Sequence, residues 1–108
     1  MTIKTLPIST NRLYYGRKIL TKEARENKEA MAWEMRAAWK GKPLEGNIKL
    51  TIDLYWPDNR PHDWDNLKAL GDSGNGILWN DDSQIVEATV RKHVDRISPR
   101  IDLSVESI

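Results

Sequence analysis

Hydrophobic and polar residues follow two different periods along this chain. From Ile48 to Trp56 apolar side chains occupy every second position, which is typical of a half-buried β-strand. Between Lys22 and Trp39 the apolar side chains recur every three to four positions, which predicts an amphipathic helix. The predicted buried stripe of this helix consists of Ala24, Met31, Met35 and Ala38, with Trp33 or Trp39 at its margin.

Shorter patterns complete the expected fold. A strand is predicted over Ile3–Leu6, and "WDNLKAL" is compatible with a short helix that stops at Gly71. The runs "QIVEATVRKHV" and "RIDLSVESI" are β-like, and we expect them to pair as a hairpin. This order of elements predicts one α/β (α+β) domain over residues 1–108. Its mixed sheet would have about four strands, with one long and one short helix.

Composition places the chain among globular proteins. Its 108 residues can bury one modest core, and 39% hydrophobic with 31% charged residues is ordinary for a folded domain. The absence of cysteine excludes a disulfide framework, a thiol nucleophile and a cysteine-ligated zinc site. No apolar run approaches the roughly 20 residues that span a bilayer, and the start lacks the apolar segment of a signal peptide. We therefore expect a cytoplasmic protein with no membrane partner.

Charge is unevenly distributed although the formal net charge is only +1. Residues 1–40 contain nine Lys and Arg residues against four Glu residues, whereas most of the acidic residues follow. A basic half beside an acidic cluster favours a polyanion held against a metal site. A helix with a solvated charged face accounts for at least half of the basic residues equally well, so both interpretations stay open.

A second basic feature is the loop "PISTNRLYYGRK", in which two tyrosines are flanked by cations. Aromatic rings interleaved with cations suit a loop that binds phosphates and stacks on bases.

Five aspartates gather within residues 62–85, "HDWDNLKALGDSGNGILWNDDSQI". Asp63 and Asp65 stand at the start of the short helix. Because each helical residue turns about 100°, they converge only if Asp63 is at the N-cap or before it. Free N–H groups there favour ionised carboxylates. Asp81 and Asp82 precede the next strand, from which a carboxylate can return to this pair. The set predicts a site for a hard cation such as Mg²⁺.

Each aspartate alone also has a structural explanation, as a helix cap or a turn residue. The whole set is harder to explain in this way, because clustered like charges cost stability unless a cation neutralises them. A calcium-binding EF-hand is excluded, since Lys68 and Gly74 stand where that loop requires Gly and Glu. Lys68 would either neutralise the cluster or stabilise charge on a phosphate. His62 and His93 lack the spacing of metal ligands, and we expect both to be surface residues.

"DWDNLK", "DSGNGILWNDDSQI" and the upstream "PISTNRLYY" resemble the RusA family of Holliday junction resolvases. The family pattern is Asp-x-Asp-Asn-Leu-x-Lys-Ala, then Asp-Ala-Leu-Asn-Gly, then Trp-x-Asp-Asp-x-Gln. The resemblance implies that Asp63, Asp65 and Asp82 bind Mg²⁺, with Mn²⁺ as a substitute. It also implies that Lys68 is the catalytic lysine and that Asp81 does not bind the metal directly.

The resemblance further implies a homodimer that cuts two opposed strands of branched DNA, a four-way junction, in recombination and repair. Combined with the basic loop, it makes the candidate DNA-binding residues Asn11, Arg12, Tyr14, Arg17, Lys18 and Asn66. The expected activity is therefore a Mg²⁺-dependent, structure-selective endodeoxyribonuclease that hydrolyses phosphodiester bonds.

Three positions depart from the family pattern. Only Asn66 and Leu67 separate Asp65 from Lys68, where the family has three residues, and one missing residue rotates a helix by about 100°. Gly74 stands where the family prefers leucine, which predicts a loss of an apolar anchor and a more mobile segment. His62 replaces a basic residue. One alternative is therefore a branched-DNA binding protein of the same fold with impaired catalysis. A metal-stabilised domain without a nucleic-acid role is a third.

Overall fold

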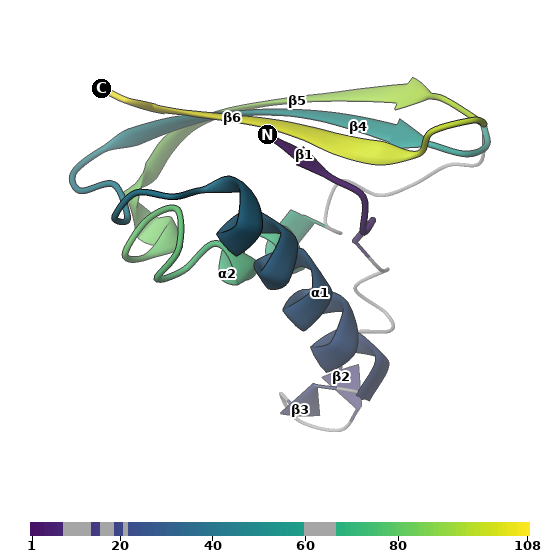
Figure 1. The fold of residues 1–108 in the computed structure, drawn as a ribbon, viewed down its shortest axis with the longest axis horizontal. Helices are drawn as coiled ribbons and strands as arrows, with labels where there is room; N and C mark the ends of the chain where they lie inside the picture. Colours follow the sequence, from purple (N-terminus) through teal and green to yellow (C-terminus); the bar gives the residue numbers. More distant parts are fainter. Residues whose placement is uncertain (8–13, 16–18, 21, 60–66) are drawn as a thin grey trace.

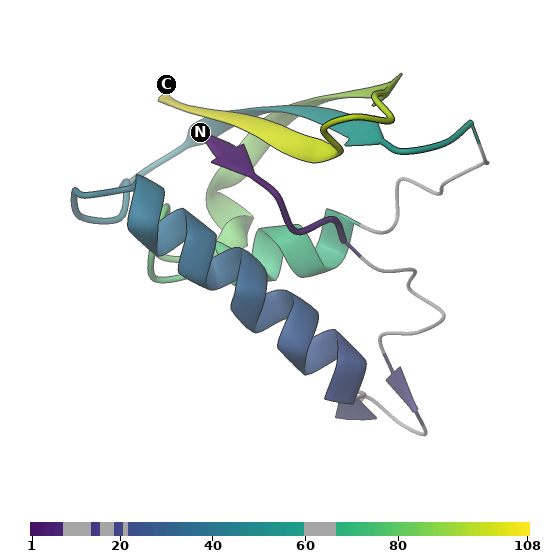
Figure 2. The ribbon, with the colours of Figure 1, turned by 45° about the vertical axis from the view of Figure 1, so that its right-hand side comes forward.

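A mixed four-stranded sheet with two helices on one of its faces makes up the fold in the computed structural model (Figures 1 and 2). The structure describes residues 1–7, 14–15, 19–20, 22–59 and 67–108. The sheet has the strand order β1-β6-β4-β5. Its strands are β1 (Thr2–Ile3), β4 (Ile48–Trp56), β5 (Ile85–Val94) and β6 (Arg100–Ser107). The helices are α1 (Lys22–Ala38), α2 (Leu67–Ser73) and a 3₁₀ turn, η3 (Asp82–Gln84), and a separate pair of short strands is β2 (Tyr14–Tyr15) and β3 (Ile19–Leu20).

β4 is the central strand, and its bounds match the prediction from alternation. Every second side chain of β4 is buried, and these side chains share one core with the buried residues of α1 and α2. Together with Ile101 and Leu103 of β6 they form the sheet side of the core. The opposite face of the sheet carries polar side chains such as Asp53 and Tyr55. The sheet therefore buries one face only, which is what a strict period of two predicts.

α1 also forms where the sequence predicts it. Ala24, Met31 and Met35 are buried as expected, and Trp39 packs at the margin of the core. Ala38 is exposed, which corrects the predicted stripe. Ala38 is the last residue of the helix. In the described part of the chain, no helix has the length and apolar character needed to cross a membrane.

The predicted hairpin of the last two strands is wrong. β4 lies between them, because β5 pairs with β4 in parallel and β6 pairs with β4 in antiparallel orientation. The connection after β5 crosses the end of β4, where the amide N–H of Asp95 donates to the carbonyl of Trp56 at 2.8 Å. The physical reason is that the most apolar strand gains most from partners on both edges.

Two boundaries also differ from the sequence prediction. β1 covers Thr2–Ile3 and not Ile3–Leu6. α2 continues through Gly71 to Ser73, so the glycine does not stop the helix. The predicted turn follows instead from Gly74, and it contains Gly76 with a φ of 79°.

Candidate active site

The turn before β5 carries Asp81 and Asp82 and gives them different environments. Asp81 is the N-cap of η3, and its carboxylate accepts a hydrogen bond from the amide N–H of Ser83 at 3.0 Å. Hydrogen bonding from Ser83 holds the pKa of the Asp81 carboxyl below its ordinary value. The carboxylate of Asp81 is therefore used in building the turn.

The carboxylate of Asp82 is left available by its surroundings. Asp82 is half-buried, and among the side chains and amides placed in residues 1–7, 22–59 and 70–108 none donates a hydrogen bond to its carboxylate or forms an ion pair with it. Gly71 of α2 lies beside it, since a Cβ atom built on Gly71 would stand 3.7 Å from Asp82 Oδ2. α2 and the turn therefore meet at Asp82.

Gln84 holds this turn in place. Its Oε1 accepts from the amide N–H groups of Asn80 at 2.8 Å and Asp81 at 2.9 Å. Its Nε2 donates to the carbonyls of Leu44 at 2.8 Å and Gly46 at 2.9 Å. One amide thus joins the turn that carries Asp82 to the loop between α1 and β4. Gln84 falls on the glutamine of the family pattern Trp-x-Asp-Asp-x-Gln, and this match was the sequence signal for a structural role that was not predicted.

Trp79 supplies the anchor beneath the segment between α2 and β5. Its indole is fully buried, and its Nε1 donates to Asn75 Oδ1 at 2.9 Å. A Cβ atom at Gly74 would lie 2.5 Å from Trp79 Cζ2, so only glycine fits against the ring. The Trp79 ring therefore occupies the space beside Gly74 that a larger side chain would enter. The predicted mobility of this segment stays a prediction.

Most of the other predicted site residues lie outside the described residues. This applies to Asp63, Asp65, Asn66 and His62, and to the loop residues Asn11, Arg12, Arg17 and Lys18. Tyr14 belongs to β2, and Lys68 belongs to α2, three residues before the Gly71 that lies against Asp82. Within the described ranges, no three acidic or imidazole side chains gather as a metal site. The convergence of Asp82 with Asp63 and Asp65 is therefore still a prediction.

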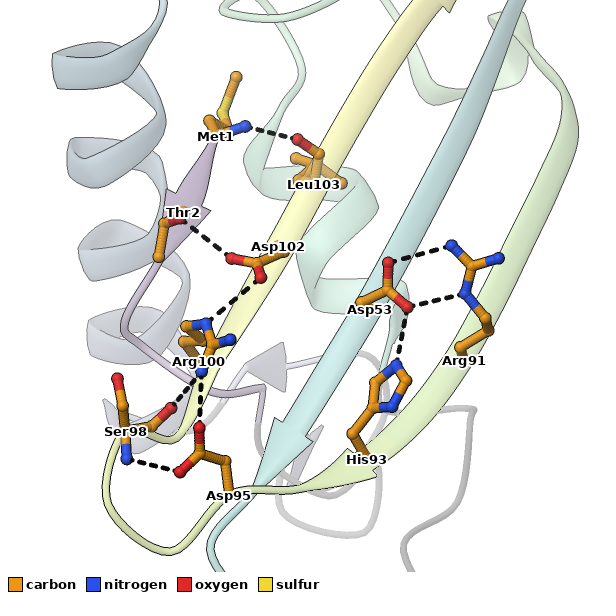
Figure 3. Close-up of polar contacts among 10 residues, drawn as sticks. All are labelled: Met1, Thr2, Asp53, Arg91, His93, Asp95, Ser98, Arg100, Asp102 and Leu103. Carbon is orange, nitrogen blue, oxygen red and sulfur yellow. Dashed lines mark hydrogen bonds and ion pairs between the residues drawn. The ribbon is translucent and has the colours of Figure 1, made fainter.

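His93 is not the simple surface residue that its spacing suggested. Its Nε2 lies 2.8 Å from Asp53 Oδ1, and Arg91 Nε donates to the same oxygen at 2.8 Å (Figure 3). The hydrogen bonds from Arg91 and then His93 lower the pKa of Asp53 to about 2. The imidazole also stacks on Tyr55, with 4.5 Å between ring centroids, and Arg100 covers Tyr55 at 3.8 Å. This network lies on the open face of the sheet, opposite the face that the helices cover.

Comparison with known proteins now identifies the family. The chain matches the family model described as "Endodeoxyribonuclease RusA" over residues 6–106. It belongs to the RusA family. A crossover junction endodeoxyribonuclease RusA of Aquifex aeolicus (strain VF5) is 33% identical to it over 97 residues, which cover 83% of this chain and 77% of that protein.

RusA family membership confirms the resemblance and the mixed four-stranded fold with one long and one short helix. It makes the chain an endonuclease, which hydrolyses phosphodiester bonds in DNA. In this RusA-family chain, the Asp82 turn and the position of Lys68 in α2 are the parts of the predicted catalytic site that lie within the described residues.

Proposed function

We propose that this RusA-family chain is a Mg²⁺-dependent endonuclease that resolves four-way DNA junctions by paired cleavage of opposed strands. The observation that carries the proposal is the contrast between Asp81, whose carboxylate caps η3, and Asp82, whose carboxylate lies beside α2 without a partner in the described structure. A carboxylate that binds a metal must have oxygens that do not already accept hydrogen bonds from other groups.

The donor set fits a hard divalent cation. Asp63, Asp65 and Asp82 would supply carboxylate oxygens, which Mg²⁺ prefers and Mn²⁺ also accepts. When bound, such a cation lowers the pKa of an attacking water and offsets charge on the leaving oxygen. Lys68 would add electrostatic stabilisation of the phosphate as its charge increases. Its position in α2, one turn before the glycine beside Asp82, supports this role.

Binding of the branched substrate would use the basic N-terminal loop. Arg12, Arg17 and Lys18 would contact phosphates, Tyr14 would stack, and Asn11 and Asn66 would donate or accept hydrogen bonds near the scissile phosphate. A homodimer with two such sites would cut two strands of one junction. A cytoplasmic location and a role in DNA recombination and repair complete the proposal.

The alternative is a branched-DNA binding protein whose catalysis is impaired. The residue missing between Asp65 and Lys68 favours it, because the helix after the deletion turns by about 100° relative to the family pattern. Tight junction binding without cleavage in Mg²⁺ would identify this alternative.

The test is incubation of the wild-type protein with a labelled four-way junction and a matched linear duplex, each with Mg²⁺ and with EDTA. We expect symmetric cuts in the junction only, and only with Mg²⁺. Asp82→Asn should lower the cleavage rate by about 10³-fold or more while leaving junction binding nearly intact. Asp65→Asn should do the same, because the carboxylates act as one unit.

Asp81→Asn is the matched control, since an asparagine can still cap η3 with its side-chain oxygen. It should cleave at nearly the wild-type rate. Equal rates for wild type and Asp82→Asn would remove Asp82 from the site. A wild-type protein that neither binds nor cuts the junction would refute the proposed function.

A further inference from the structure

Trp33 is a large aromatic side chain with 70% of its surface exposed, in the middle of α1. It lies two residues from both Met31 and Met35, which are fully buried. Two helical residues turn the side chain by about 200°, so Trp33 points away from the core. Exposed tryptophans of this kind are characteristic of binding surfaces, where they provide much of the contact energy.

Cations surround Trp33 on the same side of α1. Lys22, Arg25 and Arg36 are all exposed, and at about 100° per residue they fall with Trp33 within a sector of about 80°. The guanidinium of Arg36 lies 6.0 Å from the centroid of the Trp33 ring. We call Lys22, Arg25, Trp33 and Arg36 the α1 basic face, and Lys40, also exposed, follows directly after the helix.

The acidic residues of α1 only partly offset this charge. Glu34 is directed toward the N-terminal segment, where its carboxylate accepts from the amide N–H groups of Lys4 at 2.7 Å and Thr5 at 3.0 Å. Glu26 is 3.9 Å from Lys22. Glu29 lies among the cations and is the one acid within the sector. The sector therefore carries a net positive charge along the length of the helix.

The shape of this surface suits an extended ligand. A shallow hollow of about 190 Å³ is lined by Glu29, Ala32, Trp33 and Arg36. Enclosed small-molecule sites are larger, at roughly 300–1,000 Å³. From Lys22 to Arg36 the helix rises about 21 Å, at about 1.5 Å per residue, which matches about six steps of a DNA strand at about 3.4 Å each.

We propose that the α1 basic face binds the phosphate backbone of a duplex arm, as a contact additional to the N-terminal loop. The proposal rests on the junction-resolving function given above. Lys22, Arg25 and Arg36 neutralise phosphates, while Trp33 packs on the sugar-phosphate surface and orients Arg36. Charge complementarity selects DNA over a protein partner, because charged rather than apolar side chains surround the exposed ring.

The test measures binding of a four-way junction in EDTA as a function of salt concentration. Each phosphate contact contributes about 0.9 to the slope of log K against log salt. Arg25→Ala/Arg36→Ala should therefore reduce the slope by about 2 for each protomer bound and weaken binding at least tenfold in 0.1 M salt. Trp33→Ala should weaken binding severalfold with little change of slope. In Mg²⁺, KM should rise while kcat at saturating junction stays within about twofold of wild type.

Arg96→Ala is the matched control, because Arg96 is an exposed cation in the loop between β5 and β6. It should leave the slope unchanged. The inference is refuted if the double variant keeps the wild-type slope, or if Arg96→Ala reduces the slope as much per charge removed. It is also refuted if Trp33→Ala changes the oligomeric state in sedimentation but not DNA affinity, since the face would then be a protein interface. If the wild type cuts junctions and the double variant binds them with wild-type affinity, only this inference is refuted. If the wild type neither binds nor cuts junctions, both proposals are refuted.

Discussion

Replacing Gln84 with alanine should loosen the turn that carries Asp82. The substitution removes the four hydrogen bonds that the amide makes to Asn80, Asp81, Leu44 and Gly46. The bond to the Leu44 carbonyl is partly buried, and the other three are exposed. A hydrogen bond contributes about 0.5–1.5 kcal/mol net, and exposed groups recover most of theirs from water. We therefore expect the free energy of unfolding to fall by about 1–2 kcal/mol.

Urea denaturation in EDTA measures this loss without interference from metal binding. Gln84→Glu separates the two halves of the network, because a carboxylate still accepts from Asn80 and Asp81 but cannot donate to the two carbonyls. Asn80→Ala is the matched control, since Asn80 contributes its backbone N–H to Gln84 and keeps it. A loss below about 0.5 kcal/mol in Gln84→Ala would refute the network as a support of the turn.

Gln84→Ala should also need a higher Mg²⁺ concentration to cleave DNA. A less restrained Asp82 spends less time in the position of a ligand, so the Mg²⁺ concentration for half-maximal cleavage should rise while junction affinity in EDTA stays unchanged. An unchanged Mg²⁺ requirement, together with the expected loss of stability, would mean that Gln84 supports the fold but not the site.

Two further predictions concern stability. Gly74→Ala should lower the free energy of unfolding, measured in urea, by about 1–3 kcal/mol, because the added Cβ meets the Trp79 ring. Gly41→Ala is the control and should lower it far less, since a Cβ there has only ordinary contact distances. Equal losses in the two variants would refute the close packing at Gly74. The pKa of Asp53, lowered from 3.8 to about 2 by Arg91 and His93, makes its stabilisation fully present above the unfolded value and lost as pH falls through about 2. Asp53→Asn should therefore flatten the fall of the thermal midpoint between pH 5 and pH 2, and an unchanged fall would contradict the assignment.

Local burial was the part of the fold that could be predicted from sequence. The alternation from Ile48 to Trp56 reports directly which side chains face the core, and β4 has those bounds. The helical spacing of Ala24, Met31 and Met35 does the same for α1. In both elements the buried face depends only on the spacing of apolar residues along the chain, so the period of that spacing is enough to predict it.

The candidate site was predictable only as a set of motifs. The sequence separates Asp81 from Asp82 through the family pattern. In the structure the Asp81 carboxylate caps a turn and the Asp82 carboxylate lies beside Gly71, and their different roles toward a metal stay a prediction. Asp63 and Asp65 remain predictions. Neither the role of Gln84 nor the exposure of Trp33 was predicted, since each depends on which distant backbone or surface lies beside the residue.

The sequence by itself determined the long helix, the central strand, most of their buried positions and the family, because periodicity and motif spacing are properties of neighbouring residues. Only the tertiary structure decided that β4 separates β5 from β6, that α2 continues to Ser73, and that Gly71 lies against Asp82. These arrangements depend on contacts between segments far apart in the chain. Such contacts form where burial and hydrogen bonding are satisfied for several segments at once, so the pattern within any one segment does not predict them.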